Sequence, residues 1–292
     1  MSSLSVLDEL PDGYLVEEGA RGVLALHVDV APLLHERGYG VDSDGEFTES
    51  ALAGRAPLRE LRAGTVRLLQ RRFTHGGLMR WLTRRRFLDA ERPFRELILS
   101  DSLLRTGIRT PRVVAARARS AGVGWELEVV TRCVEGTVDL AQVLARGRAG
   151  GLALSVRRRL LVALGELVAR LHASGCRHAD LQPANVLVNE DALQGAPVEL
   201  WILDLDRSTL AAPLGDEMRR ANLARLYRHV ARRERELGPA LRRTDRMRFF
   251  RGYDPGGRTW KADWRAVSAI HARGLRWHRL GWALERGFAG RR

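Results

Sequence analysis

The chain has 292 residues, enough for one large domain or two smaller ones, and its 45% apolar composition is that of a folded protein. Its two cysteines, Cys133 and Cys176, are too few to staple a secreted fold and suit a reducing compartment. No apolar run approaches the ~18–20 residues of a membrane-spanning helix, and the acidic N-terminus lacks the pattern of a signal peptide. We therefore expect a cytoplasmic protein.

The net charge of +14 is concentrated in the C-terminal quarter. Residues 216–292 contain 21 Lys or Arg against 8 Asp or Glu, whereas residues 1–215 contain 28 against 27. Such an excess predicts a polyanionic partner: a nucleic acid, an anionic membrane, or a phosphorylated or acidic substrate. The alternative is a solvated Arg-rich surface that has no partner.

The first half of the chain predicts strands around one embedded helix. Apolar periodicity indicates the type of each segment, and Gly or Pro residues separate the segments. The expected elements are a strand at 22–30, a helix at 31–40, two strands within 54–73, a helix at 93–108, and a strand pair at 111–120 and 124–134.

The second half predicts helices. After a short joint near 131–137, the periodicity indicates helices at 139–147, 155–175 and 216–238. The order of elements therefore predicts an α+β fold with a strand-rich N-terminal part and a helical C-terminal part.

A polar segment follows the helix that ends at Gly175. It contains His178 and Asp180, with Asn185 five residues after the aspartate. An apolar run, a polar turn at 189–197 and a second apolar run then lead to Asp204. Two strands flanking a turn would bring Asp204 close to Asp180 and Asn185.

This spacing, H-x-D-x-x-x-x-N followed by an aspartate at a strand end, is typical of phosphoryl transfer from ATP. Asp180 would accept the proton of the attacking hydroxyl, and Asn185 with Asp204 would bind Mg²⁺ through oxygen. For an isolated Asp and Asn the alternative is a helix cap and an Asx turn. The complete set in this order favours a kinase-type site.

A kinase also needs a basic side chain on a strand and a glutamate on the next helix. The strand has no lysine, but Arg71 stands there, with Arg67 and Arg72 as neighbours, and Glu96 lies on the helix. The alternative for Arg71 and Glu96 is a solvated strand residue and a surface ion-pair partner.

Nucleotide contacts are also expected at the ends of two N-terminal strands. Gly54 marks the loop expected over the phosphates, and the backbone at Thr131 and Cys133 is expected to contact adenine.

Three positions depart from the protein kinase pattern. Ala179 and Gln182 replace an arginine and a lysine of the catalytic loop, and Asp206 replaces the glycine of D-F-G. No A-P-E follows, and a helix begins soon after Ser208, so a long activation segment does not fit. These departures favour a small or lipid-linked acceptor over a protein substrate.

The sequence resembles the lipopolysaccharide core kinases, most closely the 3-deoxy-D-manno-octulosonic acid (Kdo) kinases, over residues of about 52–255. The "HADLxxxN" and "DxDR" variants together are more specific than the generic kinase motifs. Residues after about 255 have no place in the resemblance. The segments that carry it are GRAPLREL, RRFTHGGLMRWL, RPFRELILSDSLLRTGIRTPRVVAA, VTRCVEGTVDLAQVL, HADLQPANVLV, WILDLDRS and NLARLYRHVARR.

The resemblance implies a two-lobed protein-kinase-like fold. An N-terminal extension at 1–50 would pack on an N-lobe at 51–132, and a C-lobe with a basic helical end would occupy 133–292. The reaction would be ATP- and Mg²⁺-dependent phosphorylation of a Kdo hydroxyl on the lipid A–core precursor. The enzyme would act at the cytoplasmic face of the inner membrane, whose anionic surface its basic C-terminal region would contact.

The resemblance also implies roles for three further residues. His178 would brace the loop, Gln182 would contact the acceptor or the γ-phosphate, and Asp206 would aid metal binding or pair with Arg207. The alternatives are a heptose kinase of the lipopolysaccharide core, another small-molecule kinase of aminoglycoside or choline type, and a non-catalytic protein on a kinase fold. No nucleic-acid partner is expected, because no module that reads nucleic acid is present.

Overall fold

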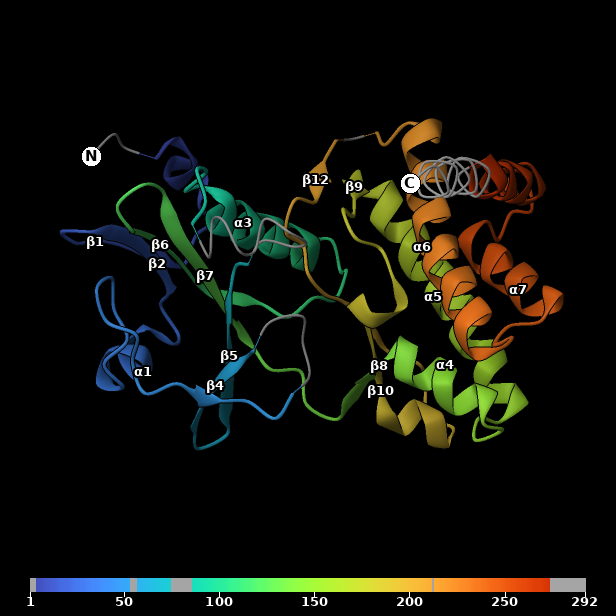
Figure 1. The fold of residues 1–292 in the computed structure, drawn as a ribbon, viewed down its shortest axis with the longest axis horizontal. Coiled ribbons are helices and arrows are strands. Elements are labelled where there is room, and N and C mark those ends of the chain that lie inside the picture. The colour runs from blue at the N-terminus through green and yellow to red at the C-terminus, as the bar shows by residue number, and fades with distance from the viewer. Residues whose placement is uncertain (1–3, 53–56, 75–85, 212, 274–292) are drawn as a thin grey trace, which may run out of the picture. The chain divides into compact units, whose positions relative to one another are not determined.

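The computed structural model describes residues 4–52, 57–74, 86–211 and 213–273 (Figure 1). The chain divides into two units. One comprises residues 1–135 and 205–207, and the other comprises 136–204 and 208–292. The expected joint near 131–137 contains this boundary. The expected division into residues 1–50, 51–132 and 133–292 stays a prediction.

The N-terminal unit is built on a seven-stranded sheet in the order β1-β2-β6-β7-β5-β4-β3, in which all neighbours are antiparallel. The strands are β1 Tyr14–Glu18, β2 Gly22–His27, β3 Thr48–Glu49, β4 Arg59–Ala63, β5 Val66–Arg72, β6 Val113–Ser120 and β7 Trp125–Arg132. Among the described residues of this unit, the helices are the 3₁₀ helix η1 Ser5–Glu9, α1 Ala31–Glu36 and α3 Arg92–Arg105.

Helical and loop segments cover both faces of this sheet. Phe94 and Leu97 of α3 pack on one face in a cluster with residues of β2, β6 and β7. On the other face, Leu34 of α1, Tyr39 and Phe47 pack against residues of β2, β4, β5 and β6. Because both faces are covered, every residue of β2 is buried, which explains its continuous apolar run.

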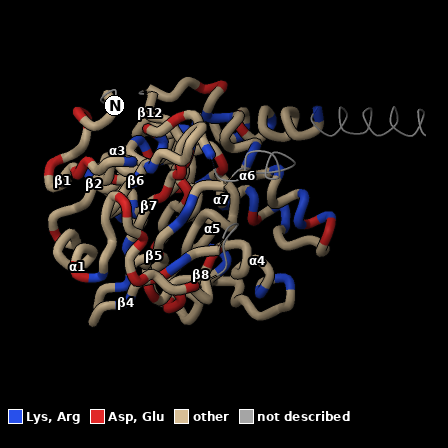
Figure 2. Tube along the Cα trace, turned by 60° about the vertical axis from the view of Figure 1, so that its left-hand side comes forward, with Lys and Arg blue, Asp and Glu red and all other residues tan. Residues whose placement is uncertain are grey.

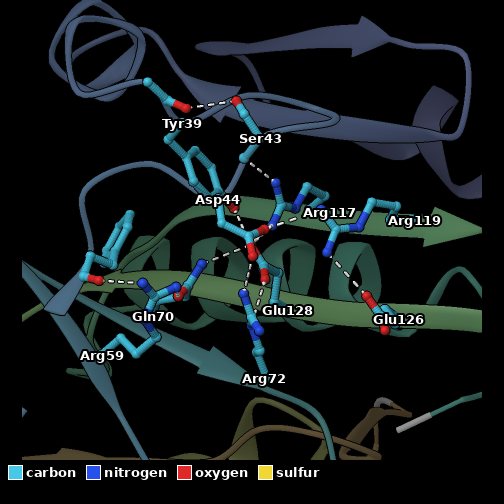
Figure 3. A network of polar contacts seen from close by, with 12 residues as sticks. Tyr39, Ser43, Asp44, Arg59, Gln70, Arg72, Arg117, Arg119, Glu126 and Glu128 are labelled. Atoms are coloured by element: carbon cyan, nitrogen blue, oxygen red, sulfur yellow. Dashed lines mark hydrogen bonds and ion pairs between the residues drawn. The ribbon is translucent and has the colours of Figure 1, made fainter. Parts of the chain in front are cut away.

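A buried polar cluster ties the loop after α1 to the sheet (Figure 3). The Arg117 side chain of β6 is 1% exposed, and its Nη2 lies 2.5 Å from Asp44 Oδ1 and 2.8 Å from Glu128 Oε1. Its Nη1 donates to the carbonyl oxygens of Gly40 and Ser43. This guanidinium is therefore enclosed by acceptors, as burial of a charge requires.

The N-terminal 50 residues, expected as an extension that packs on the N-lobe, form part of its sheet. Strand β2 pairs with β6 from Gly22↔Arg119 to Leu26↔Ala115, and β1 forms the edge beyond it. Local pattern identified β2 as a strand, but its partner lies about ninety residues away along the chain. Such long-range pairing is invisible to local periodicity.

The C-terminal unit is mainly helical (Figure 1). Its helices are α4 Leu140–Arg148, α5 Leu154–Ala173, the 3₁₀ helices η2 Pro183–Asn185 and η3 Glu190–Gln194, α6 Asp216–Leu237 and α7 Arg243–Tyr253, and residues 260–273 are also helical. Its strands are β8 Thr137–Asp139, β9 Cys176–Arg177, β10 Val186–Asn189, β11 Leu200–Ile202 and β12 Thr209–Leu210.

Two glycines allow α5 and α7 to cross closely. A Cβ atom on Gly165 would lie 2.1 Å from the Phe249 carbonyl oxygen, and one on Gly252 would lie 2.1 Å from the Val162 carbonyl oxygen. Both contacts are with backbone, which cannot rotate away as a side chain can. These glycines therefore set the distance between the two helices that carry His172 and Tyr253.

Basic residues recur along α6 and α7, as Figure 2 shows. Several of them are paired within the C-terminal unit, such as Arg220 with Asp263 and Arg246 with Glu234. Within the described ranges, no helix is long and apolar enough to cross a membrane.

Candidate active site

The polar segment after α5 is held by a neutral histidine. His178 Nε2–H donates to the Leu203 carbonyl oxygen at 2.9 Å, and its Nδ1 accepts the Asp180 N–H at 3.1 Å. These two bonds define one uncharged tautomer. Burial, the largest cause, lowers the pKa of His178 and so favours the same form. His178 lies where a bracing residue was expected.

Neutral amides contact one oxygen of the Asp180 carboxylate. Gln182 Nε2 donates to Oδ2 at 2.6 Å, and Asn185 Nδ2 lies 3.5 Å from the same oxygen. The Asn185 amide also donates to the Asp180 carbonyl oxygen at 2.8 Å. The expected neighbours Asp180 and Asn185 are thus brought together, and Gln182 joins them.

An arginine and a histidine face the other oxygen. Arg225 Nη1 lies 3.6 Å and His229 Nε2 lies 3.7 Å from Asp180 Oδ1. Both residues are on α6, outside the segments that carry the kinase motif. Only their spacing could have indicated them in the sequence. Arg225 and His229 stand three and seven residues after Asn222, and residues at these positions share one face of a helix.

The strand pair β10–β11 positions Asp204. Val186 pairs with Ile202, and the Leu203 N–H donates to the Asn185 carbonyl oxygen at 2.9 Å. Leu203 is thus hydrogen-bonded through its N–H to Asn185 and through its carbonyl to His178. Asp204 follows immediately, with a left-handed φ of 58°. The expected proximity of Asp204 to the 178–185 loop rests on these backbone bonds.

The donor chemistry of Asn185 and Asp204 fits Mg²⁺. The Asn185 amide nitrogen is occupied by Asp180, so its oxygen is the atom that can bind a cation. An amide oxygen and a carboxylate are hard ligands, and Mg²⁺ usually takes one or two of these with waters and phosphate oxygens. The described residues contain no larger His, Cys, Asp or Glu cluster of the kind that encloses a metal with protein ligands alone.

The N-terminal unit contains the expected pair of a strand arginine and a helix glutamate. Arg71 Nη2 lies 2.6 Å from both carboxylate oxygens of the buried Glu96. Its guanidinium also lies 4.7 Å from the centroid of the Phe73 ring. The neighbours Arg67 and Arg72 bind other carboxylates, on Glu60 and Asp44 respectively.

Asp206 is held by an arginine that the sequence did not suggest. Arg92 of α3 contacts both of its oxygens, with Nε 3.2 Å from Oδ1 and Nη2 2.5 Å from Oδ2. The guanidinium also lies 4.7 Å from the Phe87 ring centroid. Asp206 was expected either to aid metal binding or to pair with Arg207. In the structure it forms a fork-to-fork ion pair with Arg92, and its part in metal binding stays a prediction.

The expected adenine contacts lie at the end of β7. The Cys133 N–H donates to the Arg67 carbonyl oxygen at 2.9 Å, so this backbone donor is already paired. Thr131 lies in the sheet opposite Leu69 of β5 and Val113 of β6. Gly54, expected in the phosphate loop, lies outside the described residues.

A buried chain of hydrogen bonds connects α7, α5 and α6 to the loop that carries Asp180. The sequence did not predict it. The Tyr253 hydroxyl donates to His172 Nδ1 at 2.8 Å, and His172 Nε2–H donates to Asn222 Oδ1 at 3.1 Å. Asn222 Nδ2 in turn donates to the His178 carbonyl oxygen at 2.6 Å. Burial lowers the pKa of His172 to about 4, so this histidine is neutral and the direction of the chain is fixed.

A small apolar cavity of about 70 Å³, open to solvent, lies in the same unit. Its wall includes Leu164, Leu223, Phe249 and Trp264, and Pro183 of the loop contributes one edge. It presents almost no polar group for phosphoryl transfer. The candidate chemistry therefore belongs to the Asp180 carboxylate and not to this cavity.

Comparison with known proteins gives several matches named 3-deoxy-D-manno-octulosonic acid kinase. The protein of Xylella fastidiosa strain 9a5c is 28% identical over 190 residues, which cover 63% of this chain and 70% of the relative. That of Xanthomonas euvesicatoria pv. vesicatoria is 30% identical over 167 residues, covering 55% and 60%. That of Vibrio vulnificus strain YJ016 is 28% identical over 162 residues, covering 54% and 62%.

A solved structure, WaaP in complex with acyl carrier protein, has the same fold. It superposes with a TM-score of 0.59 at 20% identity, over 86% of this chain and 97% of that chain. The expected kinase-like α+β fold is thereby confirmed.

The sequence resemblance is confirmed by a family model. The model described as "Lipopolysaccharide kinase (Kdo/WaaP) family" matches residues 49–253, which include the 178–185 loop, Asp204 and the Arg71–Glu96 pair. The chain belongs to the lipopolysaccharide kinase (Kdo/WaaP) family.

Proposed function

We propose that this protein transfers the γ-phosphoryl group of ATP to a hydroxyl of Kdo in the lipid A–core precursor. The observation that carries the proposal is the carboxylate of Asp180, oriented by Gln182 and Asn185 on a loop that backbone bonds join to the segment before Asp204. The names of the relatives support the choice of Kdo as acceptor.

Asp180 would accept the proton of the attacking hydroxyl. A general base must present an oxygen toward the hydroxyl. The amides that contact Oδ2 orient the carboxylate, and we assign the hydroxyl to Oδ1, which Arg225 and His229 face. Asn185 and Asp204 would hold Mg²⁺, which when bound neutralises charge on the phosphate oxygens.

Arg71 would hold phosphates of ATP, with Glu96 orienting it. A guanidinium can bind phosphate through two parallel hydrogen bonds, but it is longer and wider than a lysine ammonium. Arg71 would therefore contact the phosphates in a geometry different from that of lysine.

The basic C-terminal quarter would bring the enzyme to the anionic cytoplasmic face of the inner membrane. Each Lys or Arg near such a surface contributes about 1 kcal/mol. Flotation with vesicles that contain anionic lipid should recover the protein, and raising the salt concentration should release it. Equal recovery with neutral vesicles would contradict this electrostatic attachment.

A transfer assay with γ-labelled ATP tests the function. Purified protein is offered Kdo–lipid A, a heptosylated core acceptor and an aminoglycoside, each with and without Mg²⁺. We expect label on Kdo–lipid A only, and only with Mg²⁺. Label on the heptosylated acceptor alone would assign the acceptor hydroxyl to heptose and not to Kdo. Label on neither lipid would overturn the proposal.

The same question can be asked in the cell. Mass spectrometry of lipopolysaccharide from a deletion strain should show the loss of one phosphate, and fragmentation should place that phosphate on Kdo rather than on heptose. The family model includes Kdo and WaaP kinases under one description, so heptose is the acceptor that this experiment must separate from Kdo.

A further inference from the structure

Helix α6 is docked on the loop that carries Asp180. Asn222 is buried, and its amide donates to the His178 carbonyl oxygen at 2.6 Å. Arg225 and His229 follow on the same face of the helix, one and two turns later. The Asn222 bond therefore fixes where these two side chains emerge.

The two oxygens of Asp180 have different surroundings. Oδ2 lies on the side of Asn185, the proposed metal ligand, so a transferred phosphoryl group belongs on that side. Oδ1 is faced by Arg225 at 3.6 Å and His229 at 3.7 Å. A hydroxyl that gives its proton to Oδ1 therefore brings its sugar substituents beside these two side chains.

The contacts that Arg225 and His229 make with Asp180 are loose. Both distances exceed the length of a normal hydrogen bond, so the pairs are electrostatic neighbours without aligned bonds. The Arg225 side chain is 42% exposed and that of His229 is 33% exposed, whereas Asp180 is only 20% exposed. An anion that approaches Asp180 from solvent can therefore bind Arg225 without first breaking a tight ion pair with Asp180.

We propose that Arg225, assisted by His229, binds a carboxylate of the acceptor beside Asp180 and thereby selects an acidic sugar. The inference rests on the proposed function. A planar guanidinium recognises a carboxylate through two parallel hydrogen bonds, and such charge-assisted bonds are the strong ones. Kdo carries a carboxylate and heptose carries none, so these residues would discriminate between the two acceptors.

A double-mutant cycle tests the inference. The full-length enzyme and its Arg225→Gln variant are assayed on Kdo–lipid A and on the same acceptor with its carboxylates converted to amides. We expect the variant to raise the acceptor KM by about 10- to 100-fold on the native acceptor. On the amide acceptor the variant and the wild type should be nearly equal.

Two further variants sharpen the result. Arg225→Lys keeps the charge but not the fork, so it should recover only part of the affinity for the native acceptor. His229→Gln should raise the acceptor KM by a smaller factor. Arg146→Gln on α4, an exposed arginine in the same unit, is the matched control and should leave both KM values unchanged. Thermal unfolding of each variant checks that it folds.

A different pattern would show that the charge of Arg225 acts on the transferred phosphoryl group and not on the acceptor carboxylate. If Arg225→Gln lowers kcat equally on both acceptors and also slows ATP hydrolysis without acceptor, the carboxylate assignment is wrong. Unchanged acceptor KM with transfer to Kdo intact would likewise remove the role of Arg225 while leaving the proposed function standing. Transfer by the wild type to heptose alone would overturn the proposed function, and with it the acidic acceptor.

Discussion

Arg117 in the N-terminal unit and Arg225 in the C-terminal unit both lie beside carboxylates, but they differ in how completely they are enclosed. Arg117 is 1% exposed, lies within 2.8 Å of two carboxylates, and donates to two carbonyl oxygens. Arg225 is 42% exposed and lies 3.6 Å from one carboxylate. The first has its donors occupied by the protein, whereas the second is open to a ligand.

The difference separates charges that hold the fold from charges placed for chemistry. Taking an ion out of water costs several kcal/mol, so a buried guanidinium is tolerated only with a nearly complete set of acceptors. A half-exposed guanidinium keeps much of its hydration and can exchange partners at small cost. The four predictions below test this distinction, from the largest expected effect to the smallest.

Asp180→Asn should lower kcat by about 10³-fold or more, because the hydroxyl proton loses its acceptor. The midpoint of thermal unfolding should change little, since the amide preserves the shape of the side chain. The control is Asp191→Asn, an exposed aspartate in the turn between β10 and β11, which should retain full activity. Unchanged transfer by Asp180→Asn would exclude Asp180 as the base.

Arg117→Met should reduce the free energy of unfolding by about 3 kcal/mol, because Asp44 and Glu128 would lose their fully buried cation and keep only the partly exposed Arg72 and Arg119. Urea denaturation measures the loss. Arg95→Met, which removes an exposed arginine paired with Asp89, should cost no more than about 1 kcal/mol. Equal losses of unfolding free energy in the two variants would contradict the conclusion that an enclosed arginine stabilises the fold more than an exposed one.

Glu96→Gln is an intermediate case, because Glu96 is buried while its partner Arg71 is partly exposed. Losing the charge of Glu96 should raise the KM for ATP about 5- to 10-fold and cost about 1–2 kcal/mol of stability. Glu91→Gln, which loosens a surface pair with Arg95 at the start of the same helix, serves as the control. A stability loss with unchanged KM for ATP would make the Arg71–Glu96 pair purely structural.

Asp44→Asn should change the pH dependence of stability by a small amount. Burial raises the pKa of Asp44, but the hydrogen bond and charge of Arg117, with Arg72 and Arg119, outweigh it and lower the pKa from 3.8 to about 2. A depressed carboxylate pKa contributes stability that is complete above about pH 4 and is lost as the pH falls toward 2.

Because Asp44 is 36% exposed, the contribution is reduced by solvent to about 1 kcal/mol. Urea denaturation at pH 7 and at pH 3 should therefore show a difference between wild type and Asp44→Asn that shrinks at the lower pH. A difference that grows with acidity would have the wrong sign for this account.

Local sequence pattern was sufficient to predict the helices and strands named above and the loop that carries Asp180. Gly107, with its left-handed φ of 76°, ends the helix that begins near Pro93, and the polar turn joins β10 and β11 as the apolar runs predicted. The pairing of Arg71 with Glu96 also followed, because a kinase fold fixes which strand faces which helix.

Contacts between distant segments were beyond local pattern. Arg92 and Asp206 are 114 residues apart, and nothing in either neighbourhood marks one as the partner of the other. Arg225 and His229 look like ordinary arginine-rich helix surface until Asn222 is known to dock on His178. Their identification required the tertiary position of α6.

The burial of β2 has a consequence for where the folding unit begins. The family match starts at residue 49, but the strand that pairs with β6 and the residues that cover the second face of the sheet precede it. A shortened chain that begins at residue 49 would turn β6 into an open edge and uncover Val114 and Ala115. The segment that matches the family and the segment needed to complete the N-terminal sheet are therefore different stretches of this polypeptide.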